Sequence, residues 1–224
     1  MRTSLFGLVI LMLCGNFVRA QVDTINKFRL TCGTGYFGDV TQFLKPGFNE
    51  PDYAKVNPAV RGKIHDGMNV WFRLGYNLKT GYIISGYCSM AAISYKINDP
   101  LALFWDEYLT DTYKIANVMF SKEIGKKKNR FSLGTGLVYR SYNHQDVDYP
   151  ITPVYNQDNE LIEVLMGLPE PYNLKMNDLG LVLNLEYSYR FNNRFMLGLS
   201  CSTNLIFDIG FETISVSPFI GCIF

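Results

Sequence analysis

Histidine is scarce in this chain, and a strong net charge is absent. Only two of the 224 residues are histidine, which restricts the places where an imidazole could act in catalysis. The formal net charge is +1, and the only dense cationic run is Lys126 to Lys128. A protein that binds nucleic acid needs a basic surface to match the phosphate backbone. The composition therefore predicts no nucleic-acid partner.

Long apolar runs are also missing after the first twenty residues. Those twenty contain Arg2, the apolar run Leu5 to Leu13 and the segment Val18-Arg19-Ala20, which together form the pattern of a secretory signal with a small residue at the cleavage site. We therefore expect residues 1–20 to be a signal peptide that directs Sec-dependent export. Cleavage after it leaves residues 21–224 as one mature domain.

Cys14 raises the alternative of a lipoprotein. A lipobox has a small residue before its cysteine, whereas Leu13 is bulky, so ordinary cleavage after Ala20 is favoured. Beyond Ala20 no segment approaches the roughly eighteen consecutive apolar residues that a membrane-spanning helix requires. If the mature chain spans a bilayer, it must therefore do so with strands.

Eight segments alternate apolar and polar residues with period two, the spacing at which successive side chains of a strand point to opposite faces. In Leu179–Phe191 the odd positions are Leu, Tyr or Phe, whereas the even positions are mainly small or polar. Two of the eight, Tyr82–Tyr95 and Tyr113–Ser121, alternate less clearly. The other five predicted strands are Phe28–Phe37, Met68–Asn77, Arg130–Tyr142, Phe195–Leu205 and Thr213–Phe224.

Short and long connections alternate between these strands. The short, turn-rich links are Leu78–Gly81, Lys122–Asn129 and Asn192-Asn193, and the others, except the last, are long and rich in Pro or Asp. An even number of strands lets a meander close on itself and leave no exposed edge. We therefore predict an all-β fold, a closed antiparallel up-and-down transmembrane β-barrel of eight strands, with the short turns and both termini on the periplasmic side.

Two features of the side chains predict which face of the barrel looks outward. A soluble lipocalin-type barrel also alternates, but its apolar face is inside. Here the polar face is rich in glycine, which suits a crowded lumen better than a solvated exterior; the glycines are Gly33, Gly35, Gly75, Gly134, Gly136, Gly180, Gly198 and Gly221. The apolar face ends beside the short turns in an aromatic girdle, which marks a membrane boundary. The girdle residues are Phe28, Phe131, Phe191, Phe195 and Phe224.

With these features the chain resembles the small outer-membrane barrels of Gram-negative bacteria, of the OmpX and OmpA-barrel type. Its final segment, Ser215–Phe224, resembles their terminal strand, which ends in Phe. The resemblance covers nearly all of the mature chain. It implies residence in the cell outer membrane, contact with outer-membrane lipids and insertion by the barrel assembly machinery. We also expect a monomer.

Charged residues on the polar face point into the predicted lumen. Because the side chains of an eight-stranded barrel fill its interior, a channel of porin size is excluded. A buried cation needs a carboxylate, carbonyl or water partner, and one glutamate is too few for four arginines. We predict a hydrated salt-bridge network, with an anion site or a gated pore as the alternatives. The network residues are Arg29, Arg73, Arg140, Arg190 and Glu186.

Two long predicted loops, Gly38–Asp66 and Asn143–Asp178, are rich in aromatic residues and contain prolines. Such loops are candidates for binding an extracellular ligand, with simple packing over the barrel mouth as the alternative. Between them, Asp99-Pro100 and the apolar residues up to Trp105 predict a short helix at the headgroup level. We predict a structural, adhesive or accessory assembly role for the barrel, with no metal or cofactor.

Two other functions remain open. Some small outer-membrane barrels that this chain resembles modify lipid A with a histidine and Ser or acidic partners, and only His65 and His144 could serve here. No serine lies in a recognisable nucleophile turn, so we predict that the protein is not an enzyme. The remaining alternative is a soluble periplasmic ligand carrier with a lipocalin-like barrel.

The mature chain has four cysteines, Cys32, Cys88, Cys201 and Cys222, in a compartment where disulfides form. Cys32, Cys201 and Cys222 fall on the apolar face, where cysteine acts as a small hydrophobic residue. Only Cys32 and Cys222 are expected to come close, because closure places the first strand beside the last. A bridge between Cys88 and Cys201 would contradict the predicted registers.

Overall fold

The computed structural model describes residues 27–40, 65–78, 81–96, 108–125, 128–148, 150–168, 170–207 and 209–224. The predicted signal peptide, the predicted helix after Asp99 and most of the loop Gly38–Asp66 lie outside these described residues. Among the described residues, no helix is long and apolar enough to cross a membrane.

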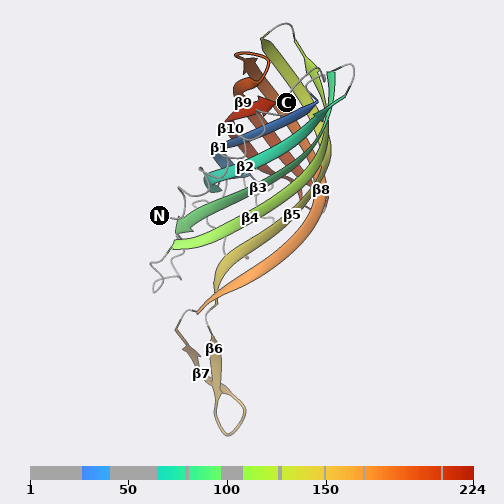
Figure 1. Cartoon of the computed structure of the whole chain (residues 1–224). Coiled ribbons are helices and arrows are strands. Elements are labelled where there is room, and N and C mark those ends of the chain that lie inside the picture. Colours follow the sequence, from blue (N-terminus) through green and yellow to red (C-terminus); the bar gives the residue numbers. More distant parts are fainter. Residues whose placement is uncertain are drawn as a thin grey trace.

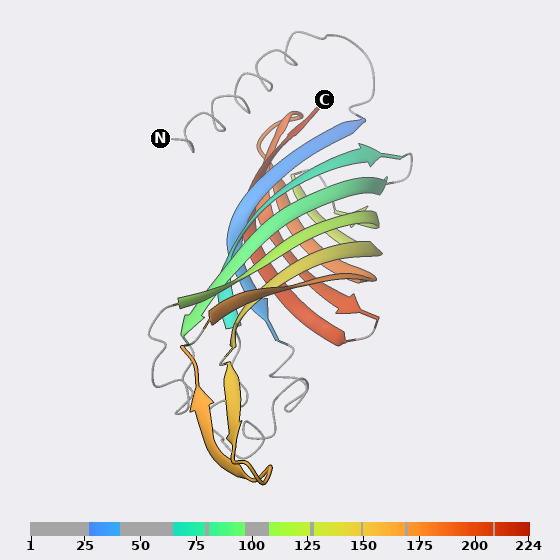
Figure 2. The same cartoon turned by 90° about the horizontal axis from the view of Figure 1, so that it is seen from below.

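Ten strands are present in the described part of the chain, and eight of them close into an antiparallel barrel (Figures 1 and 2). The eight follow one another around the barrel in chain order, and β10 pairs back onto β1. The predicted fold is therefore confirmed. The barrel strands are β1 (Phe28–Asp39), β2 (His65–Asn77), β3 (Tyr82–Lys96), β4 (Tyr108–Ile124), β5 (Asn129–Asp148), β8 (Glu170–Arg190), β9 (Phe195–Ile206) and β10 (Gly210–Ile223).

The barrel closes where β1 meets β10. Gly33 lies opposite Phe219, and at the short-turn end the Phe28 amide donates to the Phe224 carbonyl at 2.8 Å. The short turns β2–β3, β4–β5 and β8–β9 lie at this same end. In Figure 1 the C-terminus lies at the end of the barrel opposite the small hairpin of β6 and β7.

The predicted alternation of faces holds along the barrel strands. In β2, for example, Val70 is exposed whereas its neighbours Asn69 and Trp71 are buried. The two strands with unclear alternation, β3 and β4, also have apolar residues on their inner faces, which explains the weak pattern. These inner residues include Ile83, Ala91, Ile93, Tyr113, Ile115 and Met119.

Inward-facing glycines make room for large rings in the lumen. A Cβ at Gly33 would lie 2.8 Å from the Trp71 ring and 2.4 Å from the Pro218 carbonyl oxygen. A Cβ at Gly198 would lie 2.5 Å from the Phe219 ring. Because real Cβ atoms do not approach other atoms this closely, both positions require glycine, as expected for a crowded interior.

The predicted bounds of three segments are wrong: those of the fourth strand, of the link after it and of the loop Gly38–Asp66. Strand β4 is longer at both ends than the predicted Tyr113–Ser121, and the link after it is correspondingly shorter than Lys122–Asn129. The loop Gly38–Asp66 loses two residues at each end, because Gly38 and Asp39 belong to β1 and His65 and Asp66 to β2. Each of these extensions continues a ladder of hydrogen bonds with a neighbouring strand.

The largest difference concerns the predicted loop Asn143–Asp178. Strands β5 and β8 stay paired from Asp148 and Glu170 down to the barrel, and between them β6 (Ile151–Tyr155) and β7 (Leu161–Met166) form a separate two-stranded hairpin. The loop prediction followed the prolines and charged residues of this segment. Those residues are tolerated because this part of the sheet is narrow and exposed, so its backbone hydrogen bonds do not depend on a buried face.

Candidate functional site

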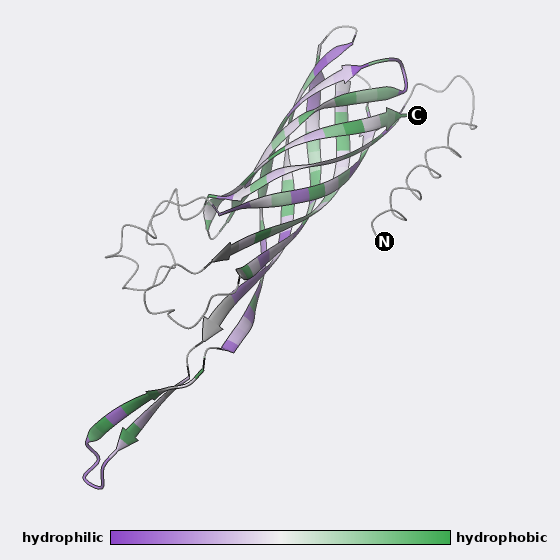
Figure 3. Cartoon of the chain, turned by 90° about the vertical axis from the view of Figure 1, so that its left-hand side faces the viewer, coloured by the Kyte–Doolittle hydropathy of each residue, from purple (hydrophilic) through white to green (hydrophobic). Residues whose placement is uncertain are grey.

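The outer face of the barrel carries an apolar belt. Large apolar side chains on every barrel strand are exposed there, for example Val70 at 64%, Leu133 at 63% and Ile220 at 66%. Figure 3 shows these apolar positions as bands along the strands. A water-soluble protein rarely exposes so large a continuous apolar surface, whereas the acyl chains of a bilayer solvate it. A lipocalin-type barrel has its apolar face inside, whereas here the apolar face is outside. The soluble-carrier alternative is therefore ruled out.

The five predicted girdle residues, Phe28, Phe131, Phe191, Phe195 and Phe224, are all exposed and lie at the short-turn ends of their strands. Several contact neighbouring rings: Phe28 and Phe224 stack with their centroids 6.1 Å apart, and the tilted rings of Phe131 and Tyr187 have centroids 5.0 Å apart. Aromatic rings at one level of a membrane barrel sit at the headgroup boundary. That this ring anchors the barrel at the boundary stays a prediction.

A group of charged side chains, here called the short-turn cluster, lies in the lumen beside the short turns. Glu123 of β4 accepts hydrogen bonds from Arg29 and from Arg190, the second at 2.7 Å. The Arg130 Nε lies 3.8 Å from the same carboxylate. Since Arg29 is only 4% exposed, its buried charge must be compensated by these partners and not by water. The short-turn cluster comprises Arg29, Arg73, Arg130, Arg190, Glu123 and Glu186.

Glu186 lies at the buried side of the short-turn cluster. It is 2% exposed and accepts a hydrogen bond from Arg73, and the Arg29 Nη1 lies 3.7 Å from its Oε1. The Arg73 Nε donates to the Thr31 hydroxyl at 3.2 Å. A cavity of about 10 Å³ beside Ser85 has room for one water molecule.

A second charged group, here called the long-loop cluster, lies at the opposite end of the lumen. Arg140, which is 1% exposed, forms ion pairs with Asp178 of β8 and Glu212 of β10. Arg140 and Asp178 are directly opposite each other in the β5–β8 ladder. The long-loop cluster comprises Arg140, Asp178, Glu212, Asp39, Asp111, Tyr113, Tyr142 and His144.

His144 belongs to the long-loop cluster and faces the interior. Its Nδ1 lies 2.9 Å from an Asp111 carboxylate oxygen and 3.1 Å from the Tyr142 hydroxyl. The Tyr142 hydroxyl donates to Asp111 at 2.8 Å, and the Tyr113 hydroxyl donates to Asp39 at 2.7 Å. This histidine is therefore held inside the barrel mouth and does not face the lipid.

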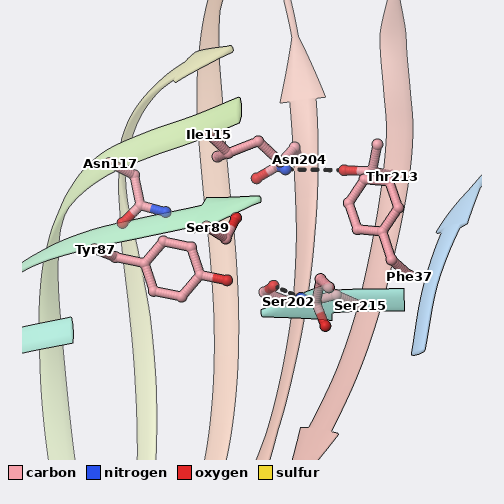
Figure 4. A pocket seen from close by; sticks show the side chains of 10 residues that line it. Phe37, Tyr87, Ser89, Ile115, Asn117, Ser202, Asn204, Thr213 and Ser215 are labelled. Atoms are coloured by element: carbon pink, nitrogen blue, oxygen red, sulfur yellow. Dashed lines mark hydrogen bonds between the residues drawn. The ribbon is translucent and has the colours of Figure 1, made fainter. Parts of the chain in front are cut away.

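Between the two clusters the lumen is packed with neutral side chains (Figure 4). The Asn204 amide donates to the Thr213 hydroxyl at 2.8 Å, and the Ser202 and Ser215 hydroxyls are 2.8 Å apart. The cavity beside them, of about 10 Å³, has room for about one water molecule. Passage of a solute through this point would require the surrounding strands to move apart.

The carboxylates that partner the arginines were mostly missed from the sequence. Glu123, which pairs with Arg29 and Arg190, lies on the inward face of β4 but beyond the end of the predicted strand. The same holds at the other end of β4 for Asp111, whose partners are Tyr142 and His144. Glu212 gives no such signal: the β9–β10 register shifts between Phe211 and Thr213, and this bulge turns two consecutive residues, Glu212 and Thr213, inward. Alternation alone predicts the opposite face for Glu212.

Beyond the barrel mouth, β5 and β8 continue as a two-stranded ribbon. Strand β8 pairs with β9 only from Gly180 onward, and β4 pairs with β5 only up to Asn143. The β6–β7 hairpin follows and points away from the barrel (Figure 3). Its turn is organised by Asn156, whose side chain accepts from the Asp158 and Glu160 amides at 2.9 and 2.8 Å.

The cysteine positions agree with the predicted registers. Cys88 on β3 and Cys201 on β9 are both exposed on the outer face, and neither is in a disulfide. The two strands are four apart around the barrel in either direction, too far for a bridge. Cys32 lies opposite Ile220 on β10, and Cys222 lies opposite Leu30 on β1, so these two cysteines occupy neighbouring strands.

No protein-family model matches the chain, and no curated protein matches it. Solved structures match it in fold. Neisserial surface protein A is similar with a TM-score of 0.51 and 8% identity over 88% of this chain and 97% of that chain. Ail, the attachment invasion locus protein of Yersinia pestis, has been solved in complex with the heparin analogue sucrose octasulfate. It is similar with a TM-score of 0.48 and 8% identity over 88% of this chain and 98% of that chain. The N-terminal β-barrel domain of Pseudomonas aeruginosa OprF has a TM-score of 0.44 and 8% identity over 88% of this chain and 98% of that chain.

The closed eight-stranded topology, the lipid-compatible outer face and the filled lumen together define an outer-membrane β-barrel of the small class. The likeness to Neisserial surface protein A agrees with this fold.

Proposed function

We propose that this protein is a monomeric surface protein of a Gram-negative outer membrane, which uses the β5–β8 ribbon and the β6–β7 hairpin to bind a partner outside the cell. Export through the Sec pathway and insertion by the barrel assembly machinery are part of this proposal. Adhesion or another surface contact is the role that we favour over a purely structural one.

Apolar side chains on the hairpin carry the proposal. Ile162 is 66% exposed and Leu165 is 48% exposed, and Leu161 and Val164 beside them are also exposed. The hairpin follows strands that extend past the barrel, so acyl chains do not cover these groups. Exposed apolar patches that face water mark interaction surfaces. Leu174 and Met176 of the β5–β8 ribbon are exposed as well.

The test is adhesion of cells that display the barrel on their surface. In one variant a short Gly-Ser turn replaces residues 151–167, and in a second Ile162 and Leu165 are both changed to Ser. We expect both variants to lose adhesion to a panel of host-cell and abiotic surfaces while the amount of folded barrel stays constant. Asp158→Ser, in the turn of the same hairpin, is the matched control. Adhesion that survives removal of the hairpin would contradict the proposal.

A lipid-modifying enzyme is the alternative function. The inward orientation of His144 toward Asp111 and Tyr142 argues against it, because a residue that attacks a lipid must reach the outer face of the barrel. We expect His144→Ala to leave the acyl pattern of lipid A unchanged when it is measured by mass spectrometry. Loss of a modification in this variant, with the barrel still folded, would favour the enzyme.

A further inference from the structure

The two ends of the lumen carry opposite formal charge. In the short-turn cluster four arginines face two carboxylates, Glu123 and Glu186, which leaves an excess of two positive charges. In the long-loop cluster Arg140 faces four carboxylates, which leaves an excess of three negative charges when His144 is neutral. A mobile anion is therefore attracted to the short-turn end and repelled from the other.

The short-turn cluster also has unused hydrogen-bond donors. Among the described residues, the Nε groups of Arg29, Arg130 and Arg190 make no hydrogen bond. Arg29 is more than nine-tenths buried, so its unpartnered donor carries a desolvation cost that an anionic acceptor would remove. Three arginines converge on the single carboxylate of Glu123, which cannot satisfy them all.

The opening of this cluster is surrounded by further cations. Lys27, Lys128 and Arg194 are exposed at the short-turn rim, and among the described residues this rim carries no exposed Asp or Glu side chain. The Lys128 ammonium lies 5.9 Å from the Tyr189 ring centroid, and that of Lys122 lies 3.8 Å from the Tyr82 ring centroid. The cations thus stand at the level of the aromatic girdle, where lipid phosphates of a bilayer lie.

We propose that the short-turn mouth of the barrel is a phosphate-binding site, with Arg130 and Arg190 as the accessible donors and Arg29 behind them. The planar guanidinium fork matches the oxygen atoms of a phosphate group, and several donors that converge on one point favour it over a diffuse ion atmosphere. The Nε atoms of Arg130 and Arg190 are buried, but the two side chains retain exposures of 28% and 23%, so part of each is open to a ligand from the short-turn end. A phosphodiester of a lipid headgroup and a free phosphate ion share this chemistry.

The experiment measures binding to the whole folded barrel in nonionic detergent by titration calorimetry. One arm uses inorganic phosphate, and the other uses short-chain phosphatidylglycerol with short-chain phosphatidylcholine as the net-neutral comparison. We expect saturable binding in at least one phosphate arm and weakening at higher salt. Binding of phosphatidylglycerol but not of phosphatidylcholine assigns a lipid headgroup, and binding of inorganic phosphate alone assigns a free ion. Absence of saturable binding in both arms overturns the proposal.

Two variants should change the affinity in opposite directions. Arg190→Gln removes a donor and should weaken binding about tenfold, whereas Glu123→Gln removes the competing carboxylate and should strengthen it. Arg130→Gln is the substitute for Arg190→Gln if the latter does not fold, as judged by gel mobility before and after boiling. Lys114→Gln removes a cation from the outer face at the other end of the barrel and should leave the affinity unchanged. Equal weakening by Lys114→Gln and the arginine variants would overturn the proposal, because it would indicate only an effect of net charge.

Discussion

At the scale of single residues, the buried carboxylates are the most sensitive positions in the lumen. Glu186 and Glu212 each compensate a guanidinium that has little access to water, so removal of either carboxylate leaves an unpaired buried charge. Glycines that lie under aromatic rings are the second sensitive class, because they are constrained by volume and not by charge. The two classes make separate predictions.

Removal of the Glu186 charge should destabilise the barrel strongly. Glu186→Gln keeps the shape of the side chain but leaves Arg73 without its ionic partner, at a cost of about 3 kcal/mol. Urea unfolding in lipid vesicles, followed by tryptophan fluorescence, measures the change. Glu163→Gln makes the same chemical change on the exposed hairpin and should alter stability by less than about 0.5 kcal/mol. Equal stability of the two variants would show that the ion pair does not stabilise the fold.

A larger residue at Gly198 should destabilise the barrel by overpacking. Gly198→Val places atoms within 2.5 Å of the Phe219 ring and 2.1 Å of the Tyr187 carbonyl, and we expect a loss of about 2 kcal/mol in the same unfolding assay. Gly86→Ala is the control, since a Cβ at Gly86 meets nothing within 4 Å on the outer face. A Gly198 variant as stable as the control would mean that the Phe219 ring moves aside easily.

At the scale of elements, the β5–β8 ribbon and the β6–β7 hairpin behave differently from the rest of the sheet. The barrel strands each have two neighbours, whereas the ribbon strands have one neighbour and the hairpin pairs only with itself. Local opening is easier where fewer hydrogen bonds and packed side chains must be disrupted. We therefore expect the hairpin, including its turn from Asn156 to Glu160, to open more easily than the barrel strands.

Protease added to intact cells should cut the hairpin and spare the barrel. We expect cleavage within residues 156–160, by an enzyme that cuts beside acidic residues, followed by recovery of two fragments that remain together until they are boiled. Mass spectrometry of the fragments identifies the site. Cleavage only after the outer membrane is permeabilised would place the hairpin on the periplasmic side and reverse the proposed topology.

At the scale of the whole molecule, closure of the sheet is the dominant structural fact. All eight barrel strands are paired on both sides, so unfolding in detergent must break a ring of hydrogen bonds that has no edge at which to start. The apolar belt then keeps the closed form in contact with detergent or lipid. These two properties lead to a simple measurement.

The folded protein should migrate differently on a detergent gel before and after boiling. A closed barrel binds less detergent than the unfolded chain, so the two forms migrate at different positions. The folded form should convert to the unfolded form only on heating. Fractionation of cells should recover it with the outer membrane. A single band in both samples, together with recovery in the soluble fraction, would contradict the closed membrane barrel.

The sequence by itself determined the features that depend on local chemistry repeated with period two. The number of barrel strands and the face that most of their side chains take follow from alternation, because side chains of a regular β-strand point to opposite faces whatever surrounds them. The order of the strands follows from their even number and from the alternation of short and long links. The girdle positions and the inward arginines follow from the same rule. Residues such as Phe28 and Arg29 were thus assigned to opposite faces without any coordinates.

Only the tertiary structure decided how the charges are paired and how far the strands extend. Glu123 meets Arg29 and Arg190 through contacts across the closed lumen, and a local bulge turns Glu212 toward Arg140 against the alternation. The ribbon and hairpin depend on backbone pairing between segments that carry no buried face of their own. The charge pairs across the lumen join residues far apart in the chain. A periodic pattern contains no information about which partner such a residue will meet.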